Sequence, residues 1–140
     1  MATTRFRGPV LQGKFNEGSV TGYNLNQKTA AYSVLIGDSG STFTCPKNDT
    51  TAGASVVFTL PTVAANEGST FTFVNTGADG QNQVQVTGAA GAEYIAYKGV
   101  VNQLTLTNTL ATSKVGDYVT VSGNRAGTEW TIMAIQGVWA

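Results

Sequence analysis

The stretch Ser69-Thr70-Phe71-Thr72-Phe73-Val74 decides the expected fold of this 140-residue chain, because Thr or Ser alternates in it with a large apolar residue. Side chains of a β-strand point alternately to its two faces, so this pattern predicts one buried and one solvated face. The same pattern recurs in Ser41-Thr42-Phe43-Thr44, Val57-Phe58-Thr59-Leu60, Leu104-Thr105-Leu106-Thr107 and Tyr118-Val119-Thr120-Val121. β-branched and aromatic residues favour strands, and the chain is therefore predicted to be all-β.

About nine short strands are expected, separated by turn formers such as Gly, Asn, Asp and Pro. They are Tyr32–Ile36, Thr42–Cys45, Ser55–Leu60, Ser69–Val74, Gln83–Thr87, Glu93–Tyr97, Val100–Thr107, Tyr118–Ser122 and Trp130–Ile135, with a terminal pairing piece at Gly137–Trp139. Asp79-Gly80 is a hairpin-turn dipeptide, and Thr62–Glu67 has room for one helical turn. Close spacing and hairpin turns predict an antiparallel β-sandwich, jelly-roll-like, or a barrel.

Four large residues are expected to pack in the core or at its end: Phe71, Phe73, Trp130 and Trp139. Trp130 alternates with Ile132 and Ala134, which indicates a core-facing row rather than a sugar-stacking platform. Trp139 lies next to the last residue, so a structural role is favoured there as well.

Residues 1–30 differ from the β domain expected over residues 31–140. They carry four basic residues against one acidic residue, whereas the rest carries four against seven. Scattered apolar residues distinguish this segment from an ordinary disordered tail, so we interpret it as an extended N-terminal arm that docks on a partner. The residues expected to make that contact are Arg5, Phe6, Arg7, Val10, Leu11 and Phe15.

The composition argues against most enzyme classes. Histidine is absent, which removes the usual general base near neutral pH and the commonest metal ligand. The charged fraction is 11% and the net charge is zero, which favours self-association over mutual repulsion. The single cysteine, Cys45, implies no disulfide, and no apolar run approaches the ~20 residues that a membrane helix needs.

Several short motifs have residue types that occur in catalytic or metal sites, but no cofactor or metal is expected at any of them. Gly37-Asp38-Ser39-Gly40 matches a serine-protease tetrapeptide, but the missing histidine favours a plain turn. Asp79, Asp117, Asn75, Asn82 and Asn108 carry oxygens that Ca²⁺ could use, yet no loop gathers them in a ligand ladder. The basic residues of the arm are too few for strong nucleic-acid binding at physiological salt.

Several segments in this order resemble a β module of tailed-phage structural proteins, which include capsid decoration (cement) proteins, head fibres and tail fibres. The matching segments are Tyr32-Ser33-Val34, Asp38-Ser39-Gly40-Ser41-Thr42-Phe43, Phe58-Thr59-Leu60-Pro61, Glu67-Gly68-Ser69-Thr70-Phe71-Thr72-Phe73-Val74-Asn75, Gly116-Asp117-Tyr118-Val119-Thr120-Val121, Trp130-Thr131-Ile132 and Gly137-Val138-Trp139. Thr4-Arg5-Phe6-Arg7-Gly8-Pro9-Val10 resembles the docking arms of such proteins. The resemblance implies a non-enzymatic virion protein, commonly a trimer.

We therefore expect a capsid decoration protein that binds the major capsid protein on the outside of the virion. The expected assembly is a homotrimer without a membrane partner. A receptor- or glycan-binding phage fibre module is the alternative, and it would need aromatic side chains exposed in a groove. A small glycosidase or lyase domain, a third hypothesis, would need two carboxylates facing each other across a cleft.

Overall fold

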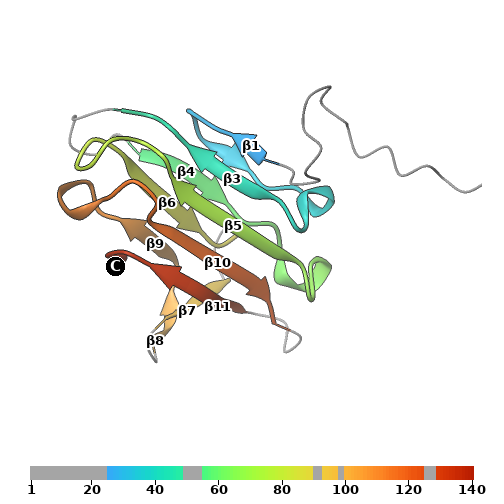
Figure 1. The fold of residues 1–140 in the computed structure, drawn as a ribbon. Coiled ribbons are helices and arrows are strands. Elements are labelled where there is room, and N and C mark those ends of the chain that lie inside the picture. Colours follow the sequence, from blue (N-terminus) through green and yellow to red (C-terminus); the bar gives the residue numbers. More distant parts are fainter. Residues whose placement is uncertain (1–24, 49–54, 90–92, 98–99, 125–128) are drawn as a thin grey trace, which may run out of the picture.

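The computed structural model describes residues 25–48, 55–89, 93–97, 100–124 and 129–140, and in them two β-sheets pack face to face (Figure 1). The larger sheet has the strand order β1-β3-β5-β10-β11-β7-β8, and the smaller sheet has the order β2-β4-β6-β9. The strands are β1 (Leu25–Gln27), β2 (Tyr32–Ser33), β3 (Thr42–Cys45), β4 (Ser55–Thr59), β5 (Thr70–Asn75), β6 (Gln83–Thr87), β7 (Tyr94–Tyr97), β8 (Val100–Gln103), β9 (Thr105–Asn108), β10 (Tyr118–Gly123) and β11 (Glu129–Gln136).

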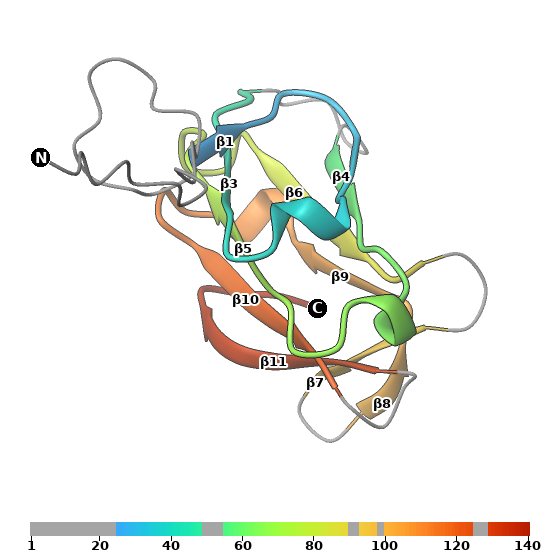
Figure 2. The same cartoon turned by 90° about the vertical axis from the view of Figure 1, so that its right-hand side faces the viewer.

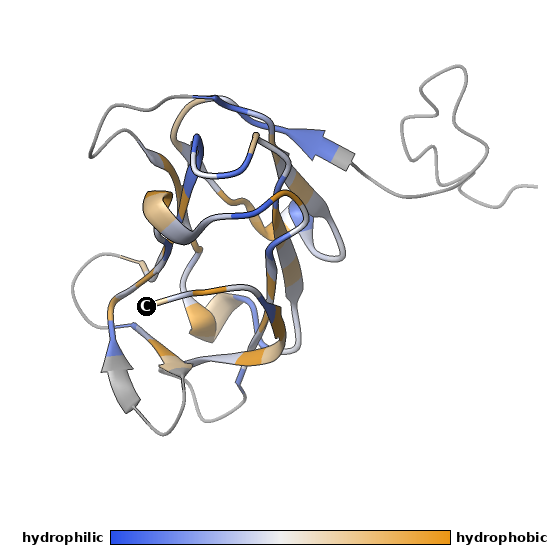
Figure 3. Cartoon of the chain, turned by 60° about the vertical axis from the view of Figure 1, so that its left-hand side comes forward, coloured by the Kyte–Doolittle hydropathy of each residue, from blue (hydrophilic) through white to orange (hydrophobic). Residues whose placement is uncertain are grey.

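The alternation in the sequence translates directly into burial. In β5, Phe71 and Phe73 are fully buried, whereas Thr70 and Thr72, which alternate with them, are only partly buried. The same alternation is visible as bands of hydrophobic and hydrophilic residues along the strands in Figure 3. The all-β prediction is confirmed, and of the two architectures left open the two-sheet sandwich is the one observed.

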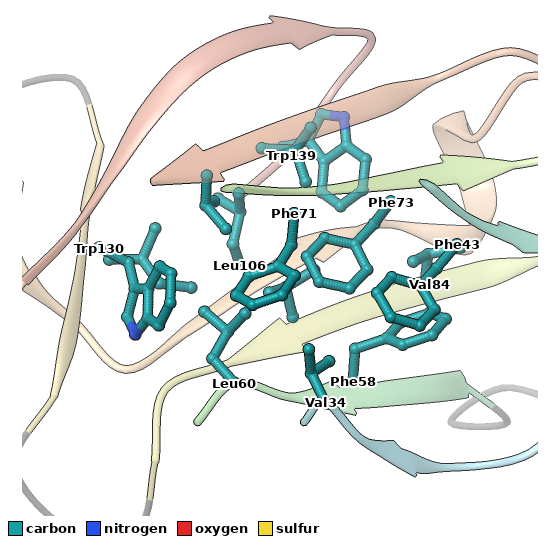
Figure 4. Packing of buried hydrophobic residues seen from close by; sticks show 14 of the residues in the cluster. Val34, Phe43, Phe58, Leu60, Phe71, Phe73, Val84, Leu106, Trp130 and Trp139 are labelled. Atoms are coloured by element: carbon teal, nitrogen blue, oxygen red, sulfur yellow. The ribbon is translucent and has the colours of Figure 1, made fainter. Parts of the chain in front are cut away.

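Aromatic side chains from both sheets fill the centre of the sandwich (Figure 4). Phe73 stacks on Phe43 with ring centroids 5.4 Å apart, and the ring centroid of Phe58, in the facing sheet, lies 4.8 Å from that of Phe73. The ring centroids of Trp130 and Phe71 are 5.5 Å apart. Trp139 is also buried, so the structure buries all four residues that were expected to pack there.

The prediction of a purely antiparallel, jelly-roll-like sandwich is wrong. The first six strands alternate between the sheets, so that β1, β3 and β5 pair in parallel in one sheet and β2, β4 and β6 pair in parallel in the other. Antiparallel pairing is found for β5–β10, β10–β11, β6–β9 and β7–β8. The period-2 pattern reports which face of a strand is buried, and that information is the same for either strand direction.

Two local expectations fail for the same reason, because the chain changes sheets where a continuous strand or a hairpin was expected. Val100–Thr107 was predicted as one strand, but it divides at the exposed Leu104 into β8 of the larger sheet and β9 of the smaller one. Asp79-Gly80 lies in a connection from β5 to β6, which belong to different sheets, and therefore closes no hairpin. The described part of the chain contains eleven strands, whereas about nine were expected.

Short 3₁₀ turns replace part of the expected strand at Tyr32–Ile36 and form the expected turn within Thr62–Glu67. Strand β2 ends at Ser33 and is followed by η1 (Ile36–Asp38), while η2 (Val63–Ala65) connects β4 to β5. A third turn, η3 (Leu110–Thr112), follows β9. Strand β1 lies inside the segment that was expected to be arm, so residues Leu25–Gln27 belong to the larger sheet.

The terminal piece pairs as expected. Trp139 forms a β-bridge with Asn108, and the backbone groups of Thr107 and Ala140 exchange two hydrogen bonds of 2.7 and 3.0 Å. The chain end therefore covers the outer edge of β9, an edge that would otherwise expose unpaired backbone groups.

The sandwich has two distinct ends. Because β1 and β3 run in parallel, the start of β1 at Leu25 lies at the same end as η1, which leads into β3. We call this end, formed by η1, η2 and the start of β1, the arm end; Figure 2 looks onto it, with η1 in teal and η2 in green. The opposite end, the far end, contains the β5–β6 connection, the η3 loop and the C-terminus (Figure 1).

Candidate assembly surfaces

The strands carry almost no charge. Among the residues that the structure assigns to strands, Glu129 is the only one with a charged side chain. Exposed sheet faces and edges of free-standing proteins commonly carry Lys or Glu, which discourages pairing between molecules. The sandwich therefore lacks the usual protection against lateral association.

Hydroxyl side chains form rows across the outer faces instead. On the smaller sheet, strand pairing aligns Ser33 with Thr59, Thr59 with Thr87, and Thr87 with Thr105. The Thr105 hydroxyl donates to Thr87 Oγ1 at 3.2 Å, and the Thr87 hydroxyl donates to the Leu104 carbonyl at 3.1 Å. This row runs over all four strands of the sheet.

The larger sheet has a similar row. Thr42 pairs with Thr72, Thr72 pairs with Thr120, and the Thr72 and Thr120 hydroxyl oxygens lie 2.9 Å apart. A hydroxyl can both donate and accept a hydrogen bond, and it carries no charge that must be desolvated. Both outer faces can therefore enter a protein contact at a lower desolvation cost than a charged face.

The arm end has a different character, because large apolar side chains are exposed there. Leu35 is 60% and Ile36 is 59% exposed. Among the residues whose side-chain exposure the structure describes, no other two sequence neighbours are both large, apolar and exposed. The sequence had predicted these residues as the end of a strand, so the exposed pair was missed. The available signal was a break in the alternation, where two apolar residues stand side by side before Gly37.

Asp38 holds this turn in place. Its Oδ2 accepts hydrogen bonds from the Leu35 N–H at 2.9 Å and from the Tyr32 hydroxyl at 3.0 Å. Burial raises the pKa of Tyr32, and the hydrogen bond to Asp38 raises it further. On the other side, Lys28 Nζ lies 3.6 Å from the centroid of the Tyr32 ring, a cation–π contact.

The protease-like tetrapeptide is therefore a turn with a structural role. Asp38 is occupied by the two donors described above, and Gly40 has a φ of 82°, a conformation that favours glycine. Ser41 N–H donates to the Asp38 carbonyl at 2.9 Å, which closes the turn before β3. These contacts explain the residues without any catalytic role.

At the far end, four of the five residues considered for Ca²⁺ do come together, but as a hydrogen-bonded network. Asn75 Nδ2 donates to Asn108 Oδ1 at 2.8 Å, and Asn82 Nδ2 donates to Asn75 Oδ1 at 2.8 Å. Asn108 Nδ2 donates to Asp117 Oδ2 at 2.9 Å and to the Val138 carbonyl at 3.0 Å. Amide oxygens that already accept N–H groups are poorly placed to bind a cation.

Asp79, the fifth candidate, lies apart from that network. It is exposed, and its carboxylate accepts from the Val115 N–H at 2.9 Å and pairs with Lys114 Nζ at 3.2 Å. The Val115 N–H lowers the pKa of this carboxyl, and Lys114 lowers it further. Within the described part of the chain, no three His, Cys, Asp or Glu side chains gather as a metal site would require.

The remaining carboxylates with resolved contacts are also dispersed. Glu93 accepts from the Val63 N–H with both of its oxygens at 2.9 Å, at the start of η2, whereas Asp117 accepts from the Lys114 N–H at 2.9 Å. Each of these carboxylates therefore ties a turn to the sandwich, and their contacts give no glycosidase-like pair.

Cys45 is enclosed by the same polar network. The thiol donates to Asn82 Oδ1 at 3.7 Å, and its side chain is buried. Burial raises the pKa of the Cys45 thiol, although the Asn82 hydrogen bond opposes this shift. The thiolate, which is the reactive form, is therefore disfavoured in the folded protein.

The two tryptophans do not form an exposed platform. Trp130 is completely buried, and Trp139 donates its Nε1–H to the Gln136 carbonyl at 2.8 Å from a buried position. These two residues therefore form no exposed platform on which a sugar ring could stack.

The six expected docking residues, Arg5, Phe6, Arg7, Val10, Leu11 and Phe15, lie outside the described residues. What the structure adds is the place where this segment joins the sandwich, namely the start of β1 at the arm end.

Comparison with known families provides no identification: no protein-family model matches the chain, and no match was found among curated protein sequences. No helix in the described residues is long and apolar enough to cross a membrane.

Proposed function

We propose that this chain is a non-enzymatic structural protein of a tailed-phage particle, a capsid decoration protein that binds the major capsid protein on the outside of the assembled shell. The observation that carries the proposal is the low charge of the strands. Among the described strand residues Glu129 is the only charged one, and hydroxyl rows lie on the outer faces of both sheets. Such faces suit contacts between copies, and the resemblance to phage β modules supplies the class of particle.

In this proposal the sandwich and the arm have separate tasks. The sandwiches associate as a trimer through their sides, and each arm binds a capsid subunit through Arg5, Phe6, Arg7, Val10, Leu11 and Phe15. A ligand that binds only the assembled shell stabilises that shell by linkage. Three arms in one trimer bind more tightly than one arm because the second and third contacts are intramolecular.

The absence of enzymatic activity is part of the proposal. The carboxylates with resolved contacts hold turns or pair with Lys114, and the one thiol is buried. These contacts give each group a structural reason for its position.

The test is binding of the full-length protein to shells that were assembled without it, measured by co-sedimentation, with the oligomeric state determined by light scattering. We expect a trimer that binds shells, and a variant with Arg5→Ala, Phe6→Ala and Arg7→Ala that remains a trimer but binds much more weakly. The control is Lys98→Ala with Arg125→Ala, which also removes two positive charges, but from outside residues 1–30. A monomer at tens of micromolar, or wild-type protein that binds glycans but not shells, would overturn the proposal.

A further inference from the structure

The exposed pair Leu35 and Ile36 lies on a turn whose backbone is tied by several hydrogen bonds. Asp38 accepts from the Leu35 N–H and the Tyr32 hydroxyl, while the Asp38 and Ser39 N–H groups donate to the Leu35 and Ile36 carbonyls at 3.0 and 3.4 Å. A backbone segment that is already ordered loses less conformational entropy when it binds. The turn thus presents two large apolar side chains on an ordered backbone.

The position of this turn follows from the parallel pairing of the first strands. Leu25 lies opposite Thr42 in the sheet, and η1 leads into the start of β3 only a few residues before Thr42. The chain that precedes β1 therefore joins the sandwich at the end where Leu35 and Ile36 are exposed. Figure 2 shows η1 on that end, together with η2.

We propose that Leu35 and Ile36 form an apolar knob that inserts into an uncharged apolar depression on the same shell subunit that the arm binds. This inference rests on the proposed decoration function and adds a second contact to it. The 24 residues that precede β1 join the sandwich at this end, so a partner bound by the part of the arm next to β1 lies close to Leu35 and Ile36. The knob and the arm then act as two linked contacts with one partner.

The geometry favours a shell subunit, rather than a second copy of this chain, as the partner that receives Leu35 and Ile36. The strands run from one end of the sandwich to the other, so copies that pack through the neutral sheet faces leave both ends free. An end is then available to face the shell, and the arm end is the one that carries both the arm junction and the exposed apolar pair.

The test compares two double variants of the full-length protein. Leu35→Ser with Ile36→Ser removes the knob, and Val115→Ser with Val138→Ser is the control. These two valines are 60% and 53% exposed at the far end, so the control removes a similar exposed apolar surface. All four residues are largely exposed, and folding is checked by circular dichroism and by the urea midpoint.

We expect the knob variant to remain trimeric and to bind shells about 10- to 100-fold more weakly, from the apolar area that it no longer buries. The control should bind within about twofold of the wild type. Equal binding of the wild type and the knob variant would overturn the inference but leave the proposed function standing. Loss of the trimer in the knob variant would assign the pair to a contact between copies. Wild-type protein that fails to bind shells would instead refute the proposed function itself.

Discussion

Replacing Asn108 with alanine tests whether the far-end network holds the sandwich closed. Asn108 is fully buried and takes part in three hydrogen bonds: to Asp117 Oδ2, to the Val138 carbonyl and from Asn75 Nδ2. A hydrogen bond to a carboxylate contributes about 1.5–3 kcal/mol, and each neutral one contributes about 1 kcal/mol. In the variant, Asp117 keeps the hydrogen bond from the Lys114 N–H, and Asn75 Nδ2 keeps its hydrogen bond of 3.2 Å to the Asn82 carbonyl.

The net loss for Asn108→Ala is therefore about 3 kcal/mol of unfolding free energy, below the full sum because two partners keep a second contact. With a urea dependence of about 1.5 kcal/mol per M, the unfolding midpoint falls by about 2 M. Urea titration followed by tryptophan fluorescence measures this shift. Trp139 is a local reporter, since it bridges to Asn108.

The control is Thr112→Ala, which removes a single exposed hydrogen bond of 3.3 Å within the η3 loop at the same end. It should change the unfolding free energy by less than about 0.5 kcal/mol. If the unfolding free energy of Asn108→Ala lies within about 1 kcal/mol of the wild-type value, the network does not hold the chain end, and our reasoning about the far end is wrong.

Three further predictions concern single sites. Gly137→Ala should destabilise the fold, because the φ of Gly137 is 93° and an added Cβ would clash with the Asp117 carboxylate. Thermal unfolding measures this effect, and an unchanged melting temperature would contradict the close approach of Gly137 to Asp117. Since the folded pKa of Tyr32 is raised, its stabilising contribution is complete below pH ~10 and is lost as the pH rises through the folded pKa. Tyr32→Phe should therefore lose less stability than the wild type in alkaline urea titrations; parallel losses would contradict this. Cys45 should react with a thiol reagent only on unfolding, and rapid reaction of native protein would contradict its burial.

The course of most strands followed from local pattern. Thr42–Cys45 and Gln83–Thr87 were predicted with the bounds that β3 and β6 have, and Phe71 and Phe73 lie on the buried face of β5. A strand that packs on one face must alternate, so its sequence shows both its course and its inward side.

Strand direction and sheet membership did not follow from that pattern. The connection through Asp79-Gly80 has good hairpin residues, yet it crosses from one sheet to the other. Turn formers mark where a strand ends, but the same residues serve a hairpin and a crossing connection. The choice depends on which distant strand offers a free edge, and this is a property of the whole assembly of strands.

The candidate surfaces, too, were predictable only in part from the local sequence. The neutral, hydroxyl-rich outer faces were visible in the sequence, whereas the exposed pair Leu35–Ile36 had been assigned to a strand. The four polar residues Asn75, Asn82, Asn108 and Asp117 had no local spacing that would bring them together. They meet because β5, β6, β9 and β10 begin or end at the far end of the sandwich.

By itself, then, the sequence determined the all-β class and the inward face of most strands, because these depend on a period of two residues, and the low charge of the outer faces, which follows from the composition. Only the tertiary structure decided the parallel winding of the first six strands, the far-end network and the placing of Leu35 and Ile36 beside the junction of the arm. Those features depend on contacts between segments far apart in the chain, which a local period does not encode.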